Sequence, residues 1–256
     1  MSSERGSSIF AYTATHGHKP KIAQTISKMR ATAGCWFDWG VWAGRPSPET
    51  ETLLHGLLFR PDRLGIQALR CWPENRGQHH ATREALAHAR LQGYDWLLRI
   101  DDDIQPKTPQ WLDRMLQRLA ALRTARAAIS GDAEWFVSSP RIVGLKNPLK
   151  PEGELVLPGI KFPVDVMPIL GGAVRLHPLG LLEGYEPPLL APKGRGDPGT
   201  IGSHVVVKKK GLLIRFPDIR VIHDTASIEA ADSPDDTVRR KMGYVWPYLG
   251  TGSPTP

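Results

Sequence analysis

The sequence predicts an α/β fold: a mostly parallel sheet flanked by helices, in a single domain of the 256-residue chain. In the first half of the chain, short apolar runs alternate with segments of helical periodicity, as expected for strands joined by crossover helices. Some of these runs are apolar throughout, which is typical of parallel strands buried on both faces. No internal repeat and no long linker divides the sequence, which favours one domain.

The expected elements of the first half follow one another in strict alternation. Strands are expected at residues 9–15, 37–43, 66–71 and 95–100. Helices are expected at residues 21–33, 47–59 and 81–91, and one more begins at Thr108-Pro109. Ser47 supplies an N-cap and Pro48 a first helical residue for the second of these helices. This order predicts βαβ units and, at the carboxyl ends of their strands, a ligand site.

The second half of the chain is less regular and richer in Pro and Gly. A hairpin is expected from residues 141–145 with 154–157, and a strand at 164–170. A helix is expected at 200–210, followed by two short strands at 212–216 and 219–222. We expect a flexible N-terminus at residues 1–7, a domain at 8–249 and a disordered tail at 250–256.

Composition narrows the function classes. The hydrophobic share of 41% and the charged share of 23% exclude a mostly disordered chain, a collagen and a coiled coil. A net charge of +7 favours a polyanionic partner, such as a nucleotide, a nucleic acid or an anionic membrane face, or serves solubility alone. Cys35 and Cys71 make neither a disulfide framework nor a metal knuckle, and we expect small buried thiols in a reducing compartment.

The sequence shows neither a recognisable targeting signal nor a membrane-spanning run. The N-terminus lacks the apolar stretch of a signal peptide, and no run reaches the roughly 18 apolar residues that span a bilayer. We therefore expect a cytoplasmic protein, with peripheral membrane contact through basic residues left open.

Three adjacent carboxylates, Asp101, Asp102 and Asp103, follow directly after a predicted buried strand. At neutral pH such carboxylates repel one another unless a cation neutralises them. Carboxylate oxygens suit Mg²⁺ or Mn²⁺, which commonly bridge to substrate phosphates. The triplet therefore predicts a divalent metal that holds a diphosphate. A solvated acidic turn or a helix N-cap is the structural alternative, although Thr108 already caps the next helix.

Other residues gather around the same predicted edge of the sheet. These residues are Asn75, Arg83, Gly171, Gly172, Asp197 and His223. Each of them also has an ordinary structural explanation, such as a tight turn, a helix cap or a strand end. Their order along the chain, together with the triplet, resembles the inverting GT-A glycosyltransferases. The resembling stretches are residues 74–106, 169–187 and 194–224, and the resemblance covers roughly residues 8–224.

The resemblance implies a Rossmann-type sheet, a donor-binding half at residues 8–106 and an acceptor-binding half at 107–249. It implies an inverting hexosyltransferase that moves a sugar from a nucleotide-sugar to an acceptor hydroxyl. The implied ligands of Mn²⁺ or Mg²⁺ are Asp101, Asp103 and His223, and the implied catalytic base is Asp197. The residues expected to bind the donor are Asp101, Asp102, Arg83, Asn75, Gly171, Gly172 and Thr13.

Two departures from the family pattern bear on specificity. Residues 43–49 lack the expected base-reading Asp, so that Arg45 or Glu49 would have to take over, and uridine recognition stays open. The acidic motif has Gly196-Asp197 where the family has Glu-Asp. The acceptor is unassigned: a glycan, a lipid-linked sugar, a protein or a small molecule would each fit.

Three rival functions stay open on the sequence alone. A metal-dependent nuclease would explain the carboxylates and the charge, but no nucleic-acid-binding motif is present and no stable nucleic-acid partner is expected. A sugar nucleotidyltransferase would carry a Gly-rich basic loop after the first strand, which residues 15–20 do not match. The third rival is a non-catalytic relative that binds nucleotides or sugars.

Overall fold

The computed structural model describes residues 8–62, 64–130, 136–143, 149–171, 173–187 and 197–223. The predicted flexible N-terminus and tail lie outside these ranges, as does Gly172. Of residues 129–130 and 197–199 the structure describes the backbone alone.

The first half of the chain forms the parallel part of the sheet, as predicted. Its strands lie side by side in the order β3-β2-β1-β4 and all run in parallel. They are β1 (Ile9–Gly17), β2 (Asp38–Pro46), β3 (Ala68–Trp72) and β4 (Trp96–Ile100). The helices between them are α1 (Ile22–Ala31), α2 (Pro48–Leu57) and α3 (Gly77–Leu91). Ser47 caps α2 as expected, because its hydroxyl accepts a hydrogen bond from Thr50 N at 3.3 Å.

The second half continues the same sheet with mixed strand directions, in the order β4-β9-β6-β10-β8-β7. The pairs β4–β9, β9–β6, β10–β8 and β8–β7 are antiparallel, and β6–β10 is parallel. The strands are β6 (Phe136–Val143), β7 (Gly153–Glu154), β8 (Asp165–Val166), β9 (Val174–Pro178) and β10 (Leu212–His223). The α/β class is confirmed, with a parallel core inside a mixed sheet.

The predicted hairpin of residues 141–145 with 154–157 is wrong. Residues 141–143 of the first segment belong to β6, which lies between β9 and β10, and the second segment overlaps β7, which pairs with β8. The local pattern misled because it does not specify a strand's partner: Arg141 to Val143 pair with Arg220 to Ile222 of β10, far along the chain. The two short strands predicted at the end of the domain are one strand, β10, with a shift in register between Phe216 and Arg220. Pro217 lies in this shift, where it leaves a ladder position without a donor.

Three further elements depart from the predicted boundaries. The strand predicted at residues 164–170 is only Asp165–Val166, and both β9 and the short β5 (Ile104–Pro106) were missed. The helix predicted at residues 200–210 is α5 (Asp197–Ser203) followed by the π-helical turn η2 (His204–Lys208). The helix expected at Thr108 is α4 (Trp111–Ser130).

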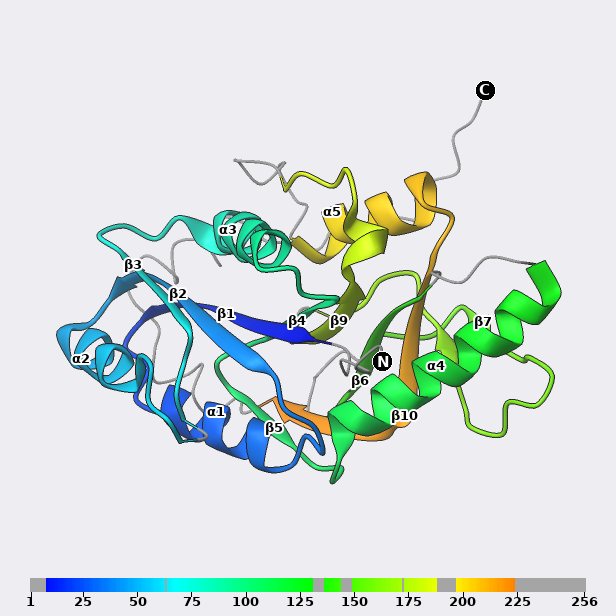
Figure 1. Ribbon diagram of the computed structural model, residues 1–256, viewed down its shortest axis with the longest axis horizontal. Helices are drawn as coiled ribbons and strands as arrows, with labels where there is room; N and C mark the ends of the chain where they lie inside the picture. Colours follow the sequence, from blue (N-terminus) through cyan, green and yellow to red (C-terminus); the bar gives the residue numbers. More distant parts are fainter. Residues whose placement is uncertain are drawn as a thin grey trace, which may run out of the picture.

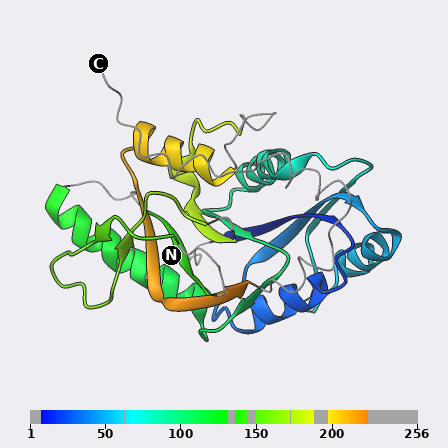
Figure 2. The same ribbon diagram turned by 180° about the vertical axis from the view of Figure 1, so that it is seen from behind.

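The sheet lies between two layers of helices (Figure 1). Helices α1, α2 and α4 cover one face, and α3 and α5 cover the other, an arrangement that the reverse view confirms (Figure 2). Alternate residues of β1 enter opposite cores: Ala11 joins the first layer, whereas Phe10 and Tyr12 join the second. None of the described helices combines the length and the apolar character that crossing a bilayer would require.

Candidate functional site

The acidic triplet lies at the carboxyl end of β4, directly beside the end of β1. These two strands are parallel neighbours in the centre of the sheet, so their carboxyl ends share one edge. Asp101 N donates a hydrogen bond of 2.8 Å to Ala173 O, which fixes the start of the triplet against the segment before β9. The triplet therefore occupies the edge at which open α/β sheets bind ligands, as the sequence predicted.

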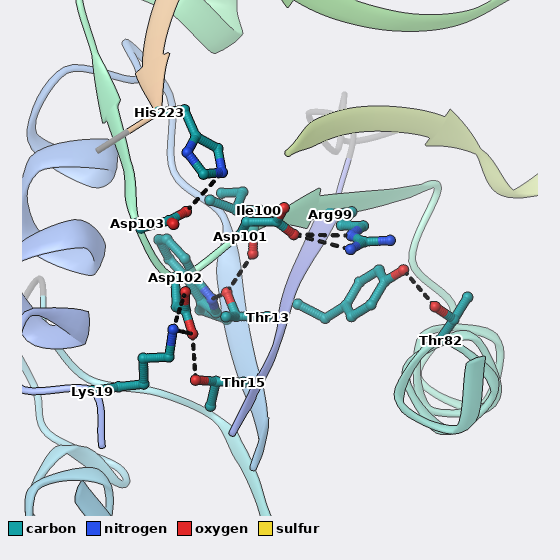
Figure 3. A network of polar contacts seen from close by, with 12 residues as sticks. Thr13, Thr15, Lys19, Thr82, Arg99, Ile100, Asp101, Asp102, Asp103 and His223 are labelled. Carbon is teal, nitrogen blue, oxygen red and sulfur yellow. Dashed lines mark hydrogen bonds and ion pairs between the residues drawn. The ribbon is translucent and has the colours of Figure 1, made fainter. Parts of the chain in front are cut away.

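The three carboxylates point in different directions, toward three separate partners (Figure 3). Asp101 Oδ1 accepts hydrogen bonds from Arg99 Nε at 3.2 Å and Arg99 Nη2 at 3.0 Å. Asp102 accepts from Thr15 Oγ1 and lies 3.3 Å from Lys19 Nζ. Each of these carboxylates is therefore neutralised or hydrogen-bonded within the chain itself.

Asp103 faces His223, which comes from the far end of the described chain. The distance from Asp103 Oδ1 to His223 Nε2 is 3.4 Å. This pair forms because β5 follows the triplet and runs antiparallel to β10, so that His223 lies opposite Ile104. Strand register thus joins two residues that the sequence analysis assigned to one metal site.

Burial sets the electrostatics of Asp103. Desolvation raises the pKa of its carboxyl to about 6, with Asp102 and Asp101 adding to the rise and His223 opposing it. Both Asp103 Oδ1 and His223 Nδ1 are buried and make no hydrogen bond with the described residues. An orphaned carboxylate oxygen beside an imidazole is an arrangement that a cation would stabilise.

The pair also passes a geometric test for a divalent metal. Two ligand atoms that each lie about 2.1 Å from one ion are about 3.0 to 3.4 Å apart, depending on the coordination angle. The observed 3.4 Å lies at the upper end of this range. Oxygen and imidazole nitrogen are suitable donors for Mn²⁺ and other divalent first-row ions. Asp103 and His223 therefore suit the divalent metal ion that the sequence predicted.

Residues that the sequence analysis did not single out hold the triplet in place. Thr25 Oγ1, on α1, donates to Asp102 O at 2.8 Å, and Thr15 and Lys19 bind the Asp102 side chain. Lys19 follows β1, and parallel strands place the segments after their carboxyl ends at the same edge. That rule is the signal by which Thr15 and Lys19 could have been found.

A small pocket opens beside Asp103. The residues that line it are Lys21, Gln24, Thr25, Asp103 and Gln105. Lys21 lines this pocket, and the ammonium group of Lys19 reaches Asp102. These two lysines place positive charge next to the carboxylates. Mixed charge of this kind suits a ligand that carries both an anion and a bound cation.

Thr13, expected to contact the donor, is buried with its side chain inside the sheet, 1% exposed. Its hydroxyl donates to Ile100 O at 2.7 Å and accepts from Trp39 Nε1 at 3.1 Å. Thr13 thus joins β1 to the end of β4 immediately before the triplet. In the structure it acts as a brace between strands.

Asn75 and Arg83 lie on the side of β3 and α3. Asn75 Oδ1 accepts from Gly77 N at 3.0 Å, which orders the turn into α3. The end of β2 approaches this turn closely, because a Cβ added at Gly44 would lie 2.9 Å from Asn75 Cα. Arg83 is exposed on α3. Within the described ranges, no hydrogen bond or ion pair joins either side chain to the triplet.

Gly171 comes close to the triplet in the chain trace, two residues before the Ala173 carbonyl that binds Asp101. A Cβ added at Gly171 would lie 3.0 Å from Ile142 Cδ1, so the position accepts a side chain only if Ile142 moves. Asp197 is the first residue of α5, and its side chain is outside what the structure describes, as is all of Gly172.

Comparison with known proteins gives structural matches only. No family model matches the sequence, and no curated protein matches it either. The chain is similar to GalNAc-T7 with UDP, GalNAc and Mn²⁺, at a TM-score of 0.59 and 13% identity, over 86% of this chain and 44% of that one. It is similar to the mannosyltransferase PcManGT from Pyrobaculum calidifontis with GDP-Man and Mn²⁺, at a TM-score of 0.58 and 16% identity, over 85% and 56%.

A third similar structure is S. aureus TarS 1–349 in complex with UDP-GlcNAc, at a TM-score of 0.53 and 11% identity, over 84% of this chain and 56% of that one. The chain thus spans about half the length of these three proteins. The likeness extends over most of this chain, and its fold is the GT-A fold.

Proposed function

We propose that this protein is a metal-dependent, inverting hexosyltransferase, which moves a sugar from a nucleotide-sugar donor to an acceptor hydroxyl. The observation that carries the proposal is the pairing of Asp103 with His223 at the carboxyl end of β4. The GT-A fold supports it, because solved proteins of that fold hold UDP, GDP-Man or UDP-GlcNAc, two of them with Mn²⁺.

Asp103 and His223 would hold Mn²⁺ or Mg²⁺, and Asp101, from the loop of Asp103, would join them by turning its carboxylate away from Arg99. When bound, the ion would offset the negative charge that develops on the leaving diphosphate. The ammonium group of Lys19 is close enough to the same loop to attract the diphosphate. Asp102, Asn75, Arg83, Gly171 and Gly172 are the further donor contacts that we propose.

Asp197 is the proposed catalytic base. A carboxylate there would accept the proton of the acceptor hydroxyl, whose oxygen then attacks the anomeric carbon opposite the leaving diphosphate. The bond to the diphosphate breaks as the new glycosidic bond forms, so that the configuration at the anomeric carbon inverts. This role needs a carboxylate that is ionised at the working pH.

The organisation of the chain forms part of the proposal. We assign residues 8–106 to the donor-binding half and residues 107–249 to the acceptor-binding half of one domain. The free thiols of Cys35 and Cys71 are consistent with a reducing, cytoplasmic location. The acceptor is left unassigned.

The first experiment measures nucleotide binding by thermal shift, with and without Mn²⁺, over a panel of nucleoside diphosphates and their sugars. A ligand that binds the native state alone raises the melting temperature. We expect a Mn²⁺-dependent shift with one base, lost in Asp103→Asn and in His223→Ala and kept in the control Asp113→Asn on α4. A shift that survives Asp103→Asn would contradict the metal assignment, and a shift with DNA or RNA alone would favour a nuclease.

The second experiment separates the base from the metal site. Asp197→Asn should keep Mn²⁺-dependent nucleotide binding and lose transfer to the acceptor by about 10²-fold or more, the usual contribution of a general base. The anomeric configuration of the product, read by NMR, checks inversion. Near-normal turnover in Asp197→Asn would refute the assignment of the base.

A further inference from the structure

A second group of metal-ligating side chains lies away from the acidic triplet, on α2 and β3. Among the residues that the structure describes, Glu51, His55 and Cys71 each offer a ligand atom, and these atoms all lie within 4.8 Å of one another. Glu51 and His55 are one turn apart on α2, so their side chains share a face of the helix. Cys71 belongs to β3, the edge strand of the sheet beside α2.

The burial pattern of α2 and the position of Cys71 on the neighbouring strand place these ligands. Thr50, Leu54 and Leu57 turn the apolar face of α2 inward, which leaves Glu51 and His55 on the outer part of the helix, about half exposed. Cys71 is half-buried on β3. The group therefore opens to solvent on the helix side and is backed by the sheet on the other.

The spacing is close to that of a tetrahedral site. Ligand atoms about 2.0 to 2.3 Å from one zinc ion lie about 3.3 to 3.8 Å apart. The nearest approach of His55 Nε2 to Glu51 Oε1 is 4.0 Å. Small rotations of exposed side chains would close the remaining gap, because neither Glu51 nor His55 is locked by packing.

We propose that Glu51, His55 and Cys71 form a zinc site that ties helix α2 to the edge strand β3, with water as the fourth ligand. A thiolate, an imidazole and a carboxylate are the donor types that zinc takes, and a thiolate disfavours Mg²⁺ and Mn²⁺. The site is therefore chemically separate from the proposed Asp103–His223 site and does not rest on the proposed function.

In the metal-free chain the sulfur of Cys71 is a neutral thiol. Burial and, to a lesser extent, Glu51 raise the pKa of the Cys71 thiol, so that the thiol is protonated at neutral pH in the metal-free chain.

Cobalt provides the test, because a thiolate ligand to Co²⁺ gives a charge-transfer absorption that carboxylate and imidazole ligands do not. The full chain, kept reduced with a phosphine, is titrated with Co²⁺ and then with Zn²⁺. We expect the thiolate band to saturate at one equivalent and to disappear on addition of Zn²⁺, but not of excess Mg²⁺ or Mn²⁺. Absence of the band at one equivalent would overturn the proposal.

Matched variants assign the ligands. The band should vanish in Cys71→Ser and persist in Cys35→Ser, the control with the other free thiol. Glu51→Ala and His55→Ala change exposed side chains and leave the fold intact. Each should weaken zinc binding by at least about 100-fold, since loss of a mere supporting residue already costs about 10- to 100-fold. Unchanged zinc affinity in these two variants would overturn the site even if Cys71→Ser fails to fold.

A last comparison keeps the two metal sites apart. Asp103→Asn and His223→Ala should keep the thiolate band at full intensity while they lose Mn²⁺-dependent nucleotide binding. If either variant removed the band, the thiolate ligand would not belong to the α2–β3 group, and the proposal would fail.

Discussion

Substitutions at Thr13 can distinguish two roles of this residue: a brace within the sheet and a contact with the donor. The substitution Thr13→Val keeps the shape of the side chain and removes the hydroxyl. That hydroxyl is buried and serves two partners, Ile100 O at 2.7 Å and Trp39 Nε1 at 3.1 Å. Neither partner can turn to water, because Trp39 is itself fully buried and Ile100 is in the core. The variant therefore leaves a buried carbonyl and a buried indole N–H without this partner.

The expected loss follows from these two groups. An unsatisfied buried polar group costs about 1 to 3 kcal/mol, and the extra methyl of valine returns about 0.8 kcal/mol. For the two groups together, we expect Thr13→Val to lower the free energy of unfolding by about 1 to 5 kcal/mol. Thr13→Ser keeps the hydroxyl, loses one buried methyl and should cost about 1 kcal/mol. Against a total stability of about 5 to 15 kcal/mol, the difference is easily measured.

Urea unfolding followed by tryptophan fluorescence gives both numbers from the shift in midpoint at constant slope. Thermal shift with Mn²⁺ and nucleotide then reports donor binding by each folded variant. If Thr13 is a brace, Thr13→Val should lose much stability, and the ligand-induced shift in melting temperature should be unchanged. Equal stabilities of Thr13→Val and Thr13→Ser would refute the reasoning, and a lost ligand-induced shift at full stability would assign Thr13 to the donor site.

Two further predictions concern stability elsewhere. Gly44→Ala places a Cβ 2.9 Å from Asn75 Cα, so we expect the free energy of unfolding in urea to fall by about 1 to 3 kcal/mol. In the control Gly56→Ala the new Cβ meets nothing within 4 Å, and this variant should stabilise α2 by about 0.5 to 1 kcal/mol. The hydrogen-bonded Arg118 guanidinium holds the pKa of Asp218 below its usual value, so its contribution is present above about pH 4 and fades as the pH falls through the lowered pKa. Asp218→Asn should therefore cost less than about 1 kcal/mol at pH 7, since the pair is partly exposed, and this difference from the wild type should shrink in acid unfolding series; a constant difference would contradict the assignment.

How much of the fold the sequence could predict depends on the range of the interactions involved. The βαβ order of the first half follows from periodicity and caps, which act over a few residues, and β1 to β4 were found within a few residues of their ends. The second half is set by pairing between distant strands, such as β6 with β10, and local pattern does not specify a partner. β9 and β5 were missed for the same reason.

The candidate site shows the same division. The triplet could be predicted because three carboxylates at a strand end are visible in the sequence. The partners of those carboxylates were harder to find: Arg99 was hidden within a buried apolar strand, and Lys19 within a loop without a motif. Thr13 was expected at the donor because of the family resemblance, which does not say which face of the sheet the hydroxyl serves.

The divergence of the three carboxylates explains how this edge of the sheet folds with its charges in a row. Two of them form ion pairs inside the chain, Asp101 with the buried Arg99 and Asp102 with Lys19. Asp103 instead faces the imidazole of His223 at 3.4 Å and has no direct lysine or arginine partner among the described residues. The one carboxylate without a permanent cation is therefore also the one whose oxygen is buried and makes no hydrogen bond with the described residues. Because the other two are already compensated, a cation binding at this edge would gain most at Asp103, and the Asp103→Asn variant should affect metal binding more than Asp102→Asn.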